Sequence, residues 1–456
     1  MFTRLEMIKN RNKITKLILL ALFFIILVLP EFQNLTNVFP QKQLSGYFQN
    51  SNKPELDSKT WLNGDYQKSY DTYFNDNIGF RSFFVCVFNQ VNYSFYKETS
   101  TNDVIVGKDK YLYSINNIEQ YYGLDTIRKD ILIWRAIQLE RITDSLKAMG
   151  IDLILVIAPS KSGYMPEYIP KGFDLKNMVN KSNYKIFTDN LKDKRVDLLD
   201  LTKWFQANKK RTKYNLFSNT GIHWSQYGVS LSADTILKYS QSLKNRNMPR
   251  LVYDTILLSN KLQGQDEDIE TSMNLLFNIK DTPMPYPKIS FDISLVTTKT
   301  KFLCIGDSYF WDFFTLDILK QGFGGGEFWY YFNEVHSMAY AKNKVKDVDK
   351  SKFLDEFKKN DIILLLANDA NLYYLTRVIS EIYEKMFPGK IDKEFEYAER
   401  EKKIDEIVED IIKTPEWLES IKKQAKERRE DLNVLIRDNA RYVYETQQAQ
   451  SKKNNL

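Results

Sequence analysis

The chain has 456 residues, 43% hydrophobic and 14% aromatic, which is enough for two or three domains with sizeable cores and excludes a wholly disordered protein. Lys and Arg number 65 against 59 Asp and Glu, and a net charge of +6 over this length is too dilute to indicate nucleic-acid binding. Two cysteines and two histidines exclude a disulfide scaffold and a Cys-rich or multi-His metal centre, so neither a metal nor a cofactor is expected.

The amino terminus carries an apolar run behind a basic segment. Residues 14–29 read ITKLILLALFFIILVL, and four cations and a single acid precede them. The uninterrupted part, 17–29, is short for a span of about 20 residues, but no small-x-small cleavage site follows. We therefore predict an uncleaved signal anchor over residues 1–30 rather than a cleaved signal peptide, with the basic end in the cytoplasm and the rest exported.

The next segments predict a linker, a helix and a hairpin. Residues 31–65 are polar and aperiodic, as in a juxtamembrane linker. Aromatic and aliphatic residues recur at helical spacing from 66 to 97, so a helix packed on a core is expected there. Two short β-prone runs flank a polar turn within 104–114, the pattern of a β-hairpin.

An α/β pattern follows. Apolar strand candidates lie at 151–160, 196–201, 301–308, 327–332 and 361–369, and helical patterns lie at 131–149, 225–245, 312–320 and 370–387. Near-continuous apolar strands that alternate with amphipathic helices are typical of a doubly wound parallel sheet, so the predicted fold class is α/β.

Two segments depart from this pattern. Residues 250–295 contain the acidic run QDEDIE (265–270) and several prolines, which predicts a loop-rich insertion between two parts of the site. Residues 389–456 are dominated by Lys and Glu with apolar residues at helical spacing, which predicts a helical C-terminal extension with solvated faces or a partner-binding role.

Ser308 is the first candidate for chemistry. It ends a predicted strand in the tripeptide Gly306-Asp307-Ser308, at the carboxyl edge where open α/β sheets bind ligands. The alternative is that Ser308 or Asp307 only caps the helix that follows.

A serine nucleophile needs a base, and His223 lies in a polar loop, SNTGIHWSQYG (218–228). The alternative is that His223 has a structural role, in which it hydrogen-bonds the loop backbone or stacks on Trp224. His336, after an aromatic stretch, is expected to be structural.

Five short motifs also occur in a fixed order. They are FNDNIGFRSFF (74–84), GKDKYLY (107–113), VIAPSKSGYMPEYIP (156–170), TGIHWSQYG (220–228) and IGDSYF (305–310). In this order and spacing they resemble the alginate O-acetyltransferase-like branch of the SGNH hydrolase superfamily, exported or membrane-anchored proteins that acetylate polysaccharide hydroxyls. The resemblance covers most of 66–385. It implies an SGNH-hydrolase-like, flavodoxin-like parallel sheet flanked by helices, in an acyltransferase domain at 66–388.

The resemblance implies a role for each matched residue. Ser308 is the nucleophile and His223 the base, whereas the family's aspartate two residues before that histidine is Gly221 here. The third member is then a backbone carbonyl or an acid from elsewhere such as Asp307 or Asp312, or else the site is inactive.

The surroundings of the nucleophile supply further candidates. Oxyanion donors are expected from the Ser308 N–H and from Asn368 or Asn371, whose alternative is ordinary helix capping. Lys161 either contacts an anionic substrate or structures its loop, and Trp224 is placed on the substrate side.

The implied function is transfer of acetyl groups to a cell-surface or secreted polysaccharide through an acetyl-Ser308 intermediate. The chain would sit in the bacterial inner membrane with its catalytic domain in the periplasm or cell exterior. The resemblance also implies a polytopic membrane protein as acetyl donor. Two alternatives stay open: an SGNH esterase with water as acceptor, and a catalytically degenerate assembly protein of a polysaccharide-modification complex.

Overall fold

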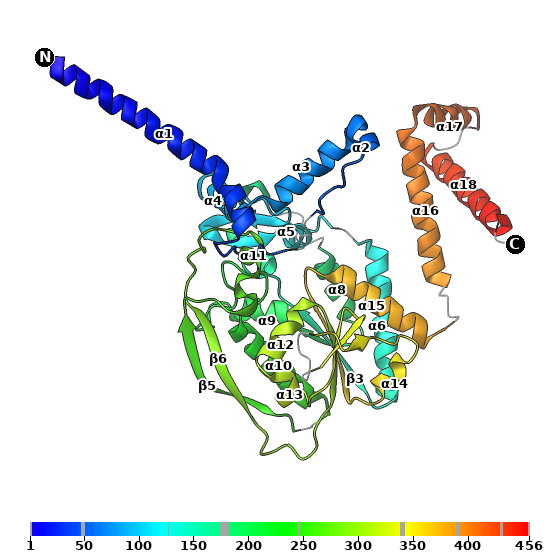
Figure 1. Cartoon of the computed structure of the whole chain (residues 1–456). Coiled ribbons are helices and arrows are strands. Elements are labelled where there is room, and N and C mark those ends of the chain that lie inside the picture. The colour runs from blue at the N-terminus through cyan, green and yellow to red at the C-terminus, as the bar shows by residue number, and fades with distance from the viewer. Residues whose placement is uncertain are drawn as a thin grey trace.

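The computed structural model describes residues 2–46, 51–125, 127–173, 182–244, 247–337, 343–388, 393–428 and 432–454 (Figure 1). Its centre is a seven-stranded sheet in the order β10-β9-β8-β7-β11-β3-β4. All five predicted strands form in it and run parallel to one another: β3 (Asp152–Ala158), β4 (Asp197–Asp200), β7 (Phe302–Gly306), β8 (Phe328–Tyr330) and β11 (Ile362–Asn368). Two short antiparallel strands, β9 (Glu334–His336) and β10 (Lys346–Asp347), extend one edge. The α/β prediction is therefore confirmed.

Helices cover both faces of this sheet (Figure 1). One face packs on α6 (Lys129–Ala148), α8 (Asn183–Leu191), α14 (Phe353–Phe357) and α15 (Leu372–Met386); the other packs on α9 (Leu201–Asn208), α10 (Gln226–Lys244), α12 (Trp311–Thr315) and α13 (Ile318–Gln321). Successive residues of β3 enter opposite cores, with Leu155 in one and Val156 in the other. Burial on both faces explains why the central strands are apolar throughout.

The amino-terminal region is more helical than predicted. α1 (Phe2–Thr36) runs past the predicted end of the anchor, and its part Lys13–Thr36 is long and apolar enough to cross a membrane. The predicted linker 31–65 therefore contains the last turns of α1, and it also contains α2 (Ser58–Asn63). The chain then forms α3 (Asp65–Asn77), α4 (Arg81–Val91) and a π-helical turn at Asn92–Tyr96.

The single helix predicted for 66–97 is wrong, because the chain breaks between α3 and α4. Ile78 is extended and Phe80 has a φ of 62°. Gly79 between them touches α1, since a Cβ there would lie 2.0 Å from the Pro30 carbonyl oxygen. The predicted hairpin follows as β1 (Val104–Val106) and β2 (Leu112–Ser114), and α5 (Ile115–Tyr122) and α7 (Lys161–Tyr164) complete this end of the domain.

The prediction that the insertion 250–295 is rich in loops is wrong. β5 (Arg250–Ser259) and β6 (Met284–Asp292) form a long antiparallel ribbon and enclose α11 (Asp268–Ser272). Pro285 and Pro287 favoured a loop in the sequence analysis. A strand can nevertheless accommodate them here, because β6 pairs only with β5 and its other edge is open. The two prolines are two residues apart and so direct their missing N–H groups to the same open edge.

The carboxyl-terminal region is helical, as expected. It forms α16 (Lys393–Lys413), α17 (Pro415–Arg428) and α18 (Leu432–Asn454). These helices share a small core of their own, which includes Ile404, Ile411, Ile421 and Ile436. Figure 1 shows this group at the opposite side of the α/β domain from the hairpin of β5 and β6, and α16 contacts α6.

Candidate active site

Two loops at the carboxyl edge of the sheet bring Ser308 and His223 together. Ser308 begins a 3-10 turn directly after β7, and His223 lies in the loop just before α10. Ser308 Oγ lies 2.8 Å from His223 Nε2. The serine is half-buried and the histidine is buried, so the pair sits at the surface of the core.

A carboxylate completes the constellation, and it is Asp268 from the start of α11. Its Oδ2 lies 2.5 Å from His223 Nδ1, and its Oδ1 accepts a 2.8 Å hydrogen bond from the Ile222 N–H. An ionised carboxylate only accepts hydrogen bonds, so it places the imidazole proton on Nδ1. Nε2 is then free to accept the hydroxyl proton of Ser308, the arrangement that activates a serine nucleophile.

The expectation that Asp307 supplies this acid is corrected by its position. Asp307 is fully buried, and its Oδ1 accepts from the Tyr309 N–H at 3.1 Å. Its Oδ2 accepts from the backbone and side-chain amides of Asn368, at 2.9 and 3.0 Å, and from the Asn371 amide at 3.2 Å. Asp307 therefore fastens the nucleophile turn to the end of β11 instead of orienting the histidine.

Gly221 explains why the acid comes from another segment. A Cβ at Gly221 would lie 2.4 Å from the Gln265 carbonyl oxygen and 2.8 Å from that of Asp266. Because real Cβ atoms do not approach backbone this closely, a side chain here would displace residues 265–266. The space that the family's aspartate would occupy holds the segment that carries Asp268.

Further hydrogen bonds join these two segments just before Gly221. The hydroxyls of Ser218 and Thr220 both donate to the Asp266 carbonyl oxygen, at 2.5 and 3.0 Å. The Glu270 N–H donates to the Thr220 carbonyl oxygen at 3.2 Å. The loop that carries His223 and the turn that carries Asp268 thus form one connected unit.

Lys161 lies beneath this unit and does not face solvent. It is 1% exposed, and its Nζ donates to the carbonyl oxygens of Asn219 at 2.7 Å and Gly221 at 2.8 Å. The rings of Tyr111 and Tyr113 flank the ammonium group. Of its two expected roles, the contacts fit the structural one, because Lys161 holds the loop ahead of His223. Burial lowers the pKa of Lys161 to about 7.

The remaining aromatic and histidine candidates belong to the packing around the site. Trp224 is fully buried against Phe205 and Tyr309, and its indole N–H donates to the Tyr309 carbonyl oxygen at 3.1 Å. His336 lies in β9 with its ring against Trp311. Both therefore pack the core around the nucleophile turn.

The electrostatics of the site raise the pKa of the His223 imidazole. Burial opposes the cation, but the hydrogen bond and charge of Asp268, with the charges of Asp312 and Asp307, outweigh it and raise the pKa of His223 above 6.5. For the neighbouring carboxyl group of Asp266, burial acts in the opposite direction and raises the pKa to about 7. Among the described residues no group of three or more His, Cys, Asp or Glu side chains could hold a metal ion. The chemistry available is nucleophilic and acid–base catalysis.

Sequence reasoning missed Asp268 as the acid. The acidic run QDEDIE (265–270) was a visible signal, yet no spacing rule links it to the histidine 45 residues earlier. The fold also places the asparagine amides of Asn368 and Asn371 on Asp307, close to the end of the nucleophile strand.

Part of the chain is similar in sequence to known proteins. The family model "SGNH hydrolase-like domain, acetyltransferase AlgX" matches residues 104–255. The chain is 23% identical over 177 residues to a probable alginate O-acetylase AlgJ of Pseudomonas syringae pv. tomato, which covers 39% of this chain and 43% of that protein. The chain thus aligns with less than half the length of this relative.

Two solved structures are similar at low identity. The O-acetyltransferase domain of Pseudomonas putida AlgJ has a TM-score of 0.39 at 18% identity, over 62% of this chain and 98% of that one. Pseudomonas aeruginosa AlgX has a TM-score of 0.39 at 14% identity, over 62% and 67%. By its motifs and its family match, the chain resembles the alginate O-acetyltransferase-like branch of the SGNH hydrolase superfamily, as the sequence predicted.

Proposed function

We propose that this protein is an exported, membrane-anchored O-acetyltransferase that transfers acetyl groups to hydroxyls of a cell-surface or secreted polysaccharide. The observation that carries the proposal is the Asp268–His223–Ser308 constellation, with 2.5 and 2.8 Å contacts at the two imidazole nitrogens. The similarity to proteins named alginate O-acetylase supports acetyl as the group and a polysaccharide as the acceptor.

The reaction consists of two acyl transfers. His223 Nε2 takes the Ser308 hydroxyl proton as Oγ attacks the acetyl carbonyl, and the tetrahedral intermediate expels the donor's leaving group, which receives that proton. A sugar hydroxyl then loses its proton to His223 and attacks acetyl-Ser308. The second intermediate releases the acetylated sugar, and the proton returns to Ser308 Oγ.

Each tetrahedral intermediate places negative charge on the former carbonyl oxygen. We assign its stabilisation to the Ser308 backbone N–H at the start of its 3-10 turn and to the side-chain amide of Asn371, which is half-buried beside Asp307. The Asn368 amide is buried and bonded to Asp307, so its role is to hold that carboxylate.

Membrane attachment and partners are part of the same proposal. α1 anchors the chain in the bacterial inner membrane, with the α/β domain in the periplasm or cell exterior. A polytopic membrane protein supplies the acetyl groups from the cytoplasm. We assign the binding of such a partner to the helices α16 to α18, which have a small core of their own.

The first test follows acetylation of the detergent-solubilised full chain by intact mass after incubation with p-nitrophenyl acetate. A single acetyl adduct is expected in the wild type and in the control Ser351→Ala, which removes an exposed serine, and not in Ser308→Ala. The absence of an adduct in all three would favour the degenerate assembly protein. Once the adduct forms, the rate at which it is lost is compared in water alone and with added oligosaccharide. Loss in water alone indicates an esterase, whereas loss that depends on the oligosaccharide indicates a transferase.

A further inference from the structure

One surface of α4 is apolar and exposed although the helix packs on the protein. Phe84, Phe88 and Val91 are 46%, 61% and 41% exposed, and Phe95 in the following π-helical turn is 78% exposed. At about 100° per residue, the first three fall within a narrow arc of one helix face. We call these four residues the α4 stripe.

The opposite face of α4 holds the turn that carries the catalytic acid. Asn89 is buried and its amide donates to the Met273 carbonyl oxygen at 2.8 Å, just beyond α11. Tyr93 packs in one cluster with Ile269 of α11 and with β1 and β2. The helix is thus fixed to the catalytic domain while its stripe faces outward.

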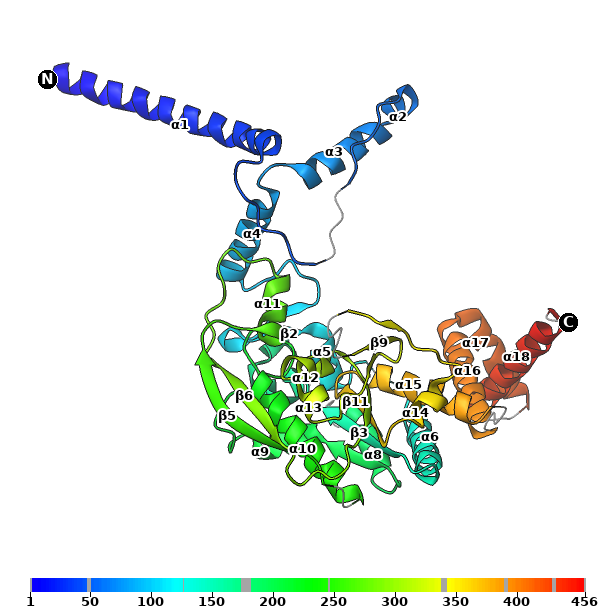
Figure 2. The ribbon, with the colours of Figure 1, turned by 60° about the horizontal axis from the view of Figure 1, so that its bottom comes forward.

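The stripe continues the apolar surface of α1. Gly79, just before α4, lies against the Pro30 carbonyl oxygen, because a Cβ at this position would be only 2.0 Å from that oxygen. Side chains of α1 and α4 line one apolar hollow of about 430 Å³, among them Ile26, Leu29, Phe83 and Phe84. Both ribbon views show α4 beside the carboxyl end of α1 (Figures 1 and 2).

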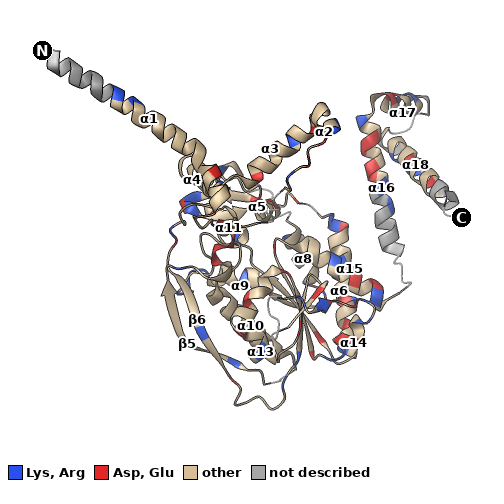
Figure 3. Ribbon diagram, viewed as in Figure 1, with Lys and Arg blue, Asp and Glu red and all other residues tan. Residues whose placement is uncertain are grey.

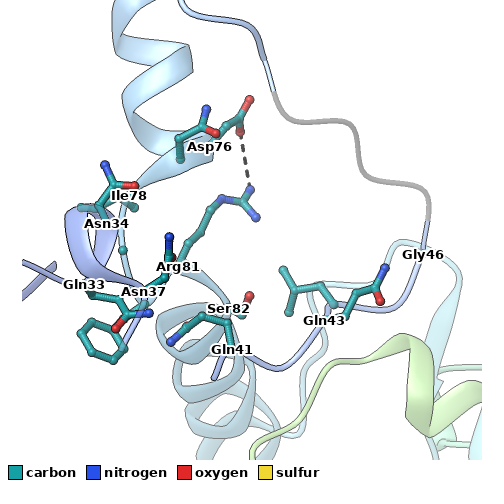
Figure 4. Close-up of a pocket in the computed structure, with 14 residues that line it drawn as sticks. Gln33, Asn34, Asn37, Gln41, Gln43, Gly46, Asp76, Ile78, Arg81 and Ser82 are labelled. Carbon is teal, nitrogen blue, oxygen red and sulfur yellow. Dashed lines mark ion pairs between the residues drawn. The ribbon is translucent and has the colours of Figure 1, made fainter. Parts of the chain in front are cut away.

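A second hollow at the same end of α1 is lined mainly by polar side chains. Gln33, Asn34 and Asn37 of the last turns of α1 and the following coil line it together with Asp76 and Arg81, which form a 3.7 Å ion pair (Figure 4). Leu29 and Gln33 are four residues apart, about 6 Å along the helix axis. The lining therefore changes from apolar side chains to amides within about one turn of α1.

Charge along the segment fits the same boundary. Between Asp76 and Glu98 the chain has no acid and two cations, Arg81 and Lys97, one at each end of the α4 segment. α1 is free of charge between Lys16 and Glu31, and Figure 3 shows that long tan stretch. Aromatic side chains with flanking cations are the composition of helices that lie in an anionic lipid interface.

We propose that α4 and its π-helical turn lie in the membrane interface, with the α4 stripe among the lipid acyl chains. The inference rests on the anchor in the proposed function, because α1 brings the stripe to the bilayer. Lipid is the occupant because the stripe is continuous with the surface of α1 that lipid must surround. The inner face of α4 holds α11, so this contact fixes the Asp268–His223–Ser308 site at a set height and orientation above the membrane.

The test measures lipid exposure by electron paramagnetic resonance of spin labels on the full chain in nanodiscs that contain anionic phospholipid. Labels are placed at F84C, F88C and V91C on the stripe, at L20C in α1, and at L295C as an exposed apolar control after β6. The native cysteines, Cys86 and Cys304, are buried and need no replacement. Collision with oxygen reports lipid, and collision with a water-soluble nickel complex reports water.

The stripe and α1 labels are expected to favour oxygen over nickel several-fold relative to L295C. Stripe labels that behave like L295C, with L20C in lipid, would overturn this inference and leave the anchor standing. Stripe labels shielded from both reagents would mean that a second copy covers the helix, which also overturns it. A water-exposed L20C would refute the anchor itself.

Discussion

Asp268 Oδ2 lies 2.5 Å from His223 Nδ1, although the two residues are 45 positions apart and belong to different segments. The resemblance to the alginate O-acetyltransferase-like branch implies an acid two residues before the histidine, where this chain has Gly221. Because the glycine has no side chain, the turn 265–268 reaches the histidine loop. The carboxylate beside the imidazole therefore comes from a segment 45 residues further along the chain.

Replacement of Asp268 is the direct test of this relationship. Asp268→Asn keeps the shape but no longer selects the Nδ1–H tautomer or stabilises the imidazolium. We expect the rate of Ser308 acetylation to fall on the order of 10⁴-fold, the scale known for a triad carboxylate. The control Glu267→Gln should retain the wild-type rate when acetylation by p-nitrophenyl acetate is followed by intact mass. Equal rates for Asp268→Asn and the control would remove Asp268 from the mechanism.

Substitution of Gly221 should damage the site even where it restores the family's residue. In Gly221→Asp the Cβ must displace the carbonyl groups of Gln265 and Asp266, so we expect loss of ~1–3 kcal/mol of stability, typical of overpacking, together with loss of activity. The double variant Gly221→Asp/Asp268→Ala should stay inactive. Gly172→Ala is the matched control, since nothing lies within 4 Å of its Cβ. Thermal unfolding and the acetylation rate are the readouts, and an active double variant would contradict the steric argument.

The pH dependence of acyl transfer should follow His223. A base acts in its neutral form, so kcat/KM is expected to rise with pH through a midpoint above 6.5, because Asp268 and the nearby acids raise the pKa of His223 despite its burial. In Asp268→Asn the midpoint should move to lower pH, since burial remains and the main opposing charge is gone.

The same shift links His223 to stability. A raised folded-state pKa stabilises the fold fully below 6.5, and this contribution is lost as pH rises through the folded pKa. Proton NMR can follow it, because the chain has only two histidines and His336→Gln assigns the pair. A His223 resonance that titrates below 6.5 in the wild type would contradict this account.

Lys161 should act on the rate through the loop that it holds. Lys161→Met removes the donors to the Asn219 and Gly221 carbonyl oxygens, and a buried acceptor left unsatisfied costs about 1–3 kcal/mol. We expect a lower Tm and a lower kcat with little change in KM, whereas the exposed control Lys210→Met should change neither. A large rise in KM alone would instead point to contact with substrate.

Titration of Lys161 gives a second readout. Its pKa is lowered to about 7 by burial, so between about 7 and 10.5 the unfolded chain binds more protons than the folded one. Stability should rise with pH across that window in the wild type. The slope should be smaller in Lys161→Met, as measured by denaturant unfolding at several pH values. An unchanged slope would show that Lys161 does not titrate there.

Local pattern predicted the elements whose burial is regular. The five apolar strands, the hairpin at 104–114 and the helices of the carboxyl-terminal region follow from periodicity and composition. Ser308 and His223 were singled out as candidates in the same way, because a strand end and a polar loop are marked by their own residues, and the fold brings their side chains together. The break at Ile78 to Phe80 was not, since it depends on contact of Gly79 with Pro30 of α1.

The sequence by itself therefore determined the α/β class and the apolar amino-terminal helix, and it singled out Ser308 and His223 as candidates for nucleophile and base. Only the tertiary structure decided which acid serves His223, that Asp307 fastens Asn368 and Asn371, and that Lys161 lies under the loop. Periodicity records which face of an element is buried, but it carries no information on which distant segment will fill a given space. At this site that choice was made by the missing Cβ of Gly221, a feature that gains meaning only when residues 265–268 pack against it.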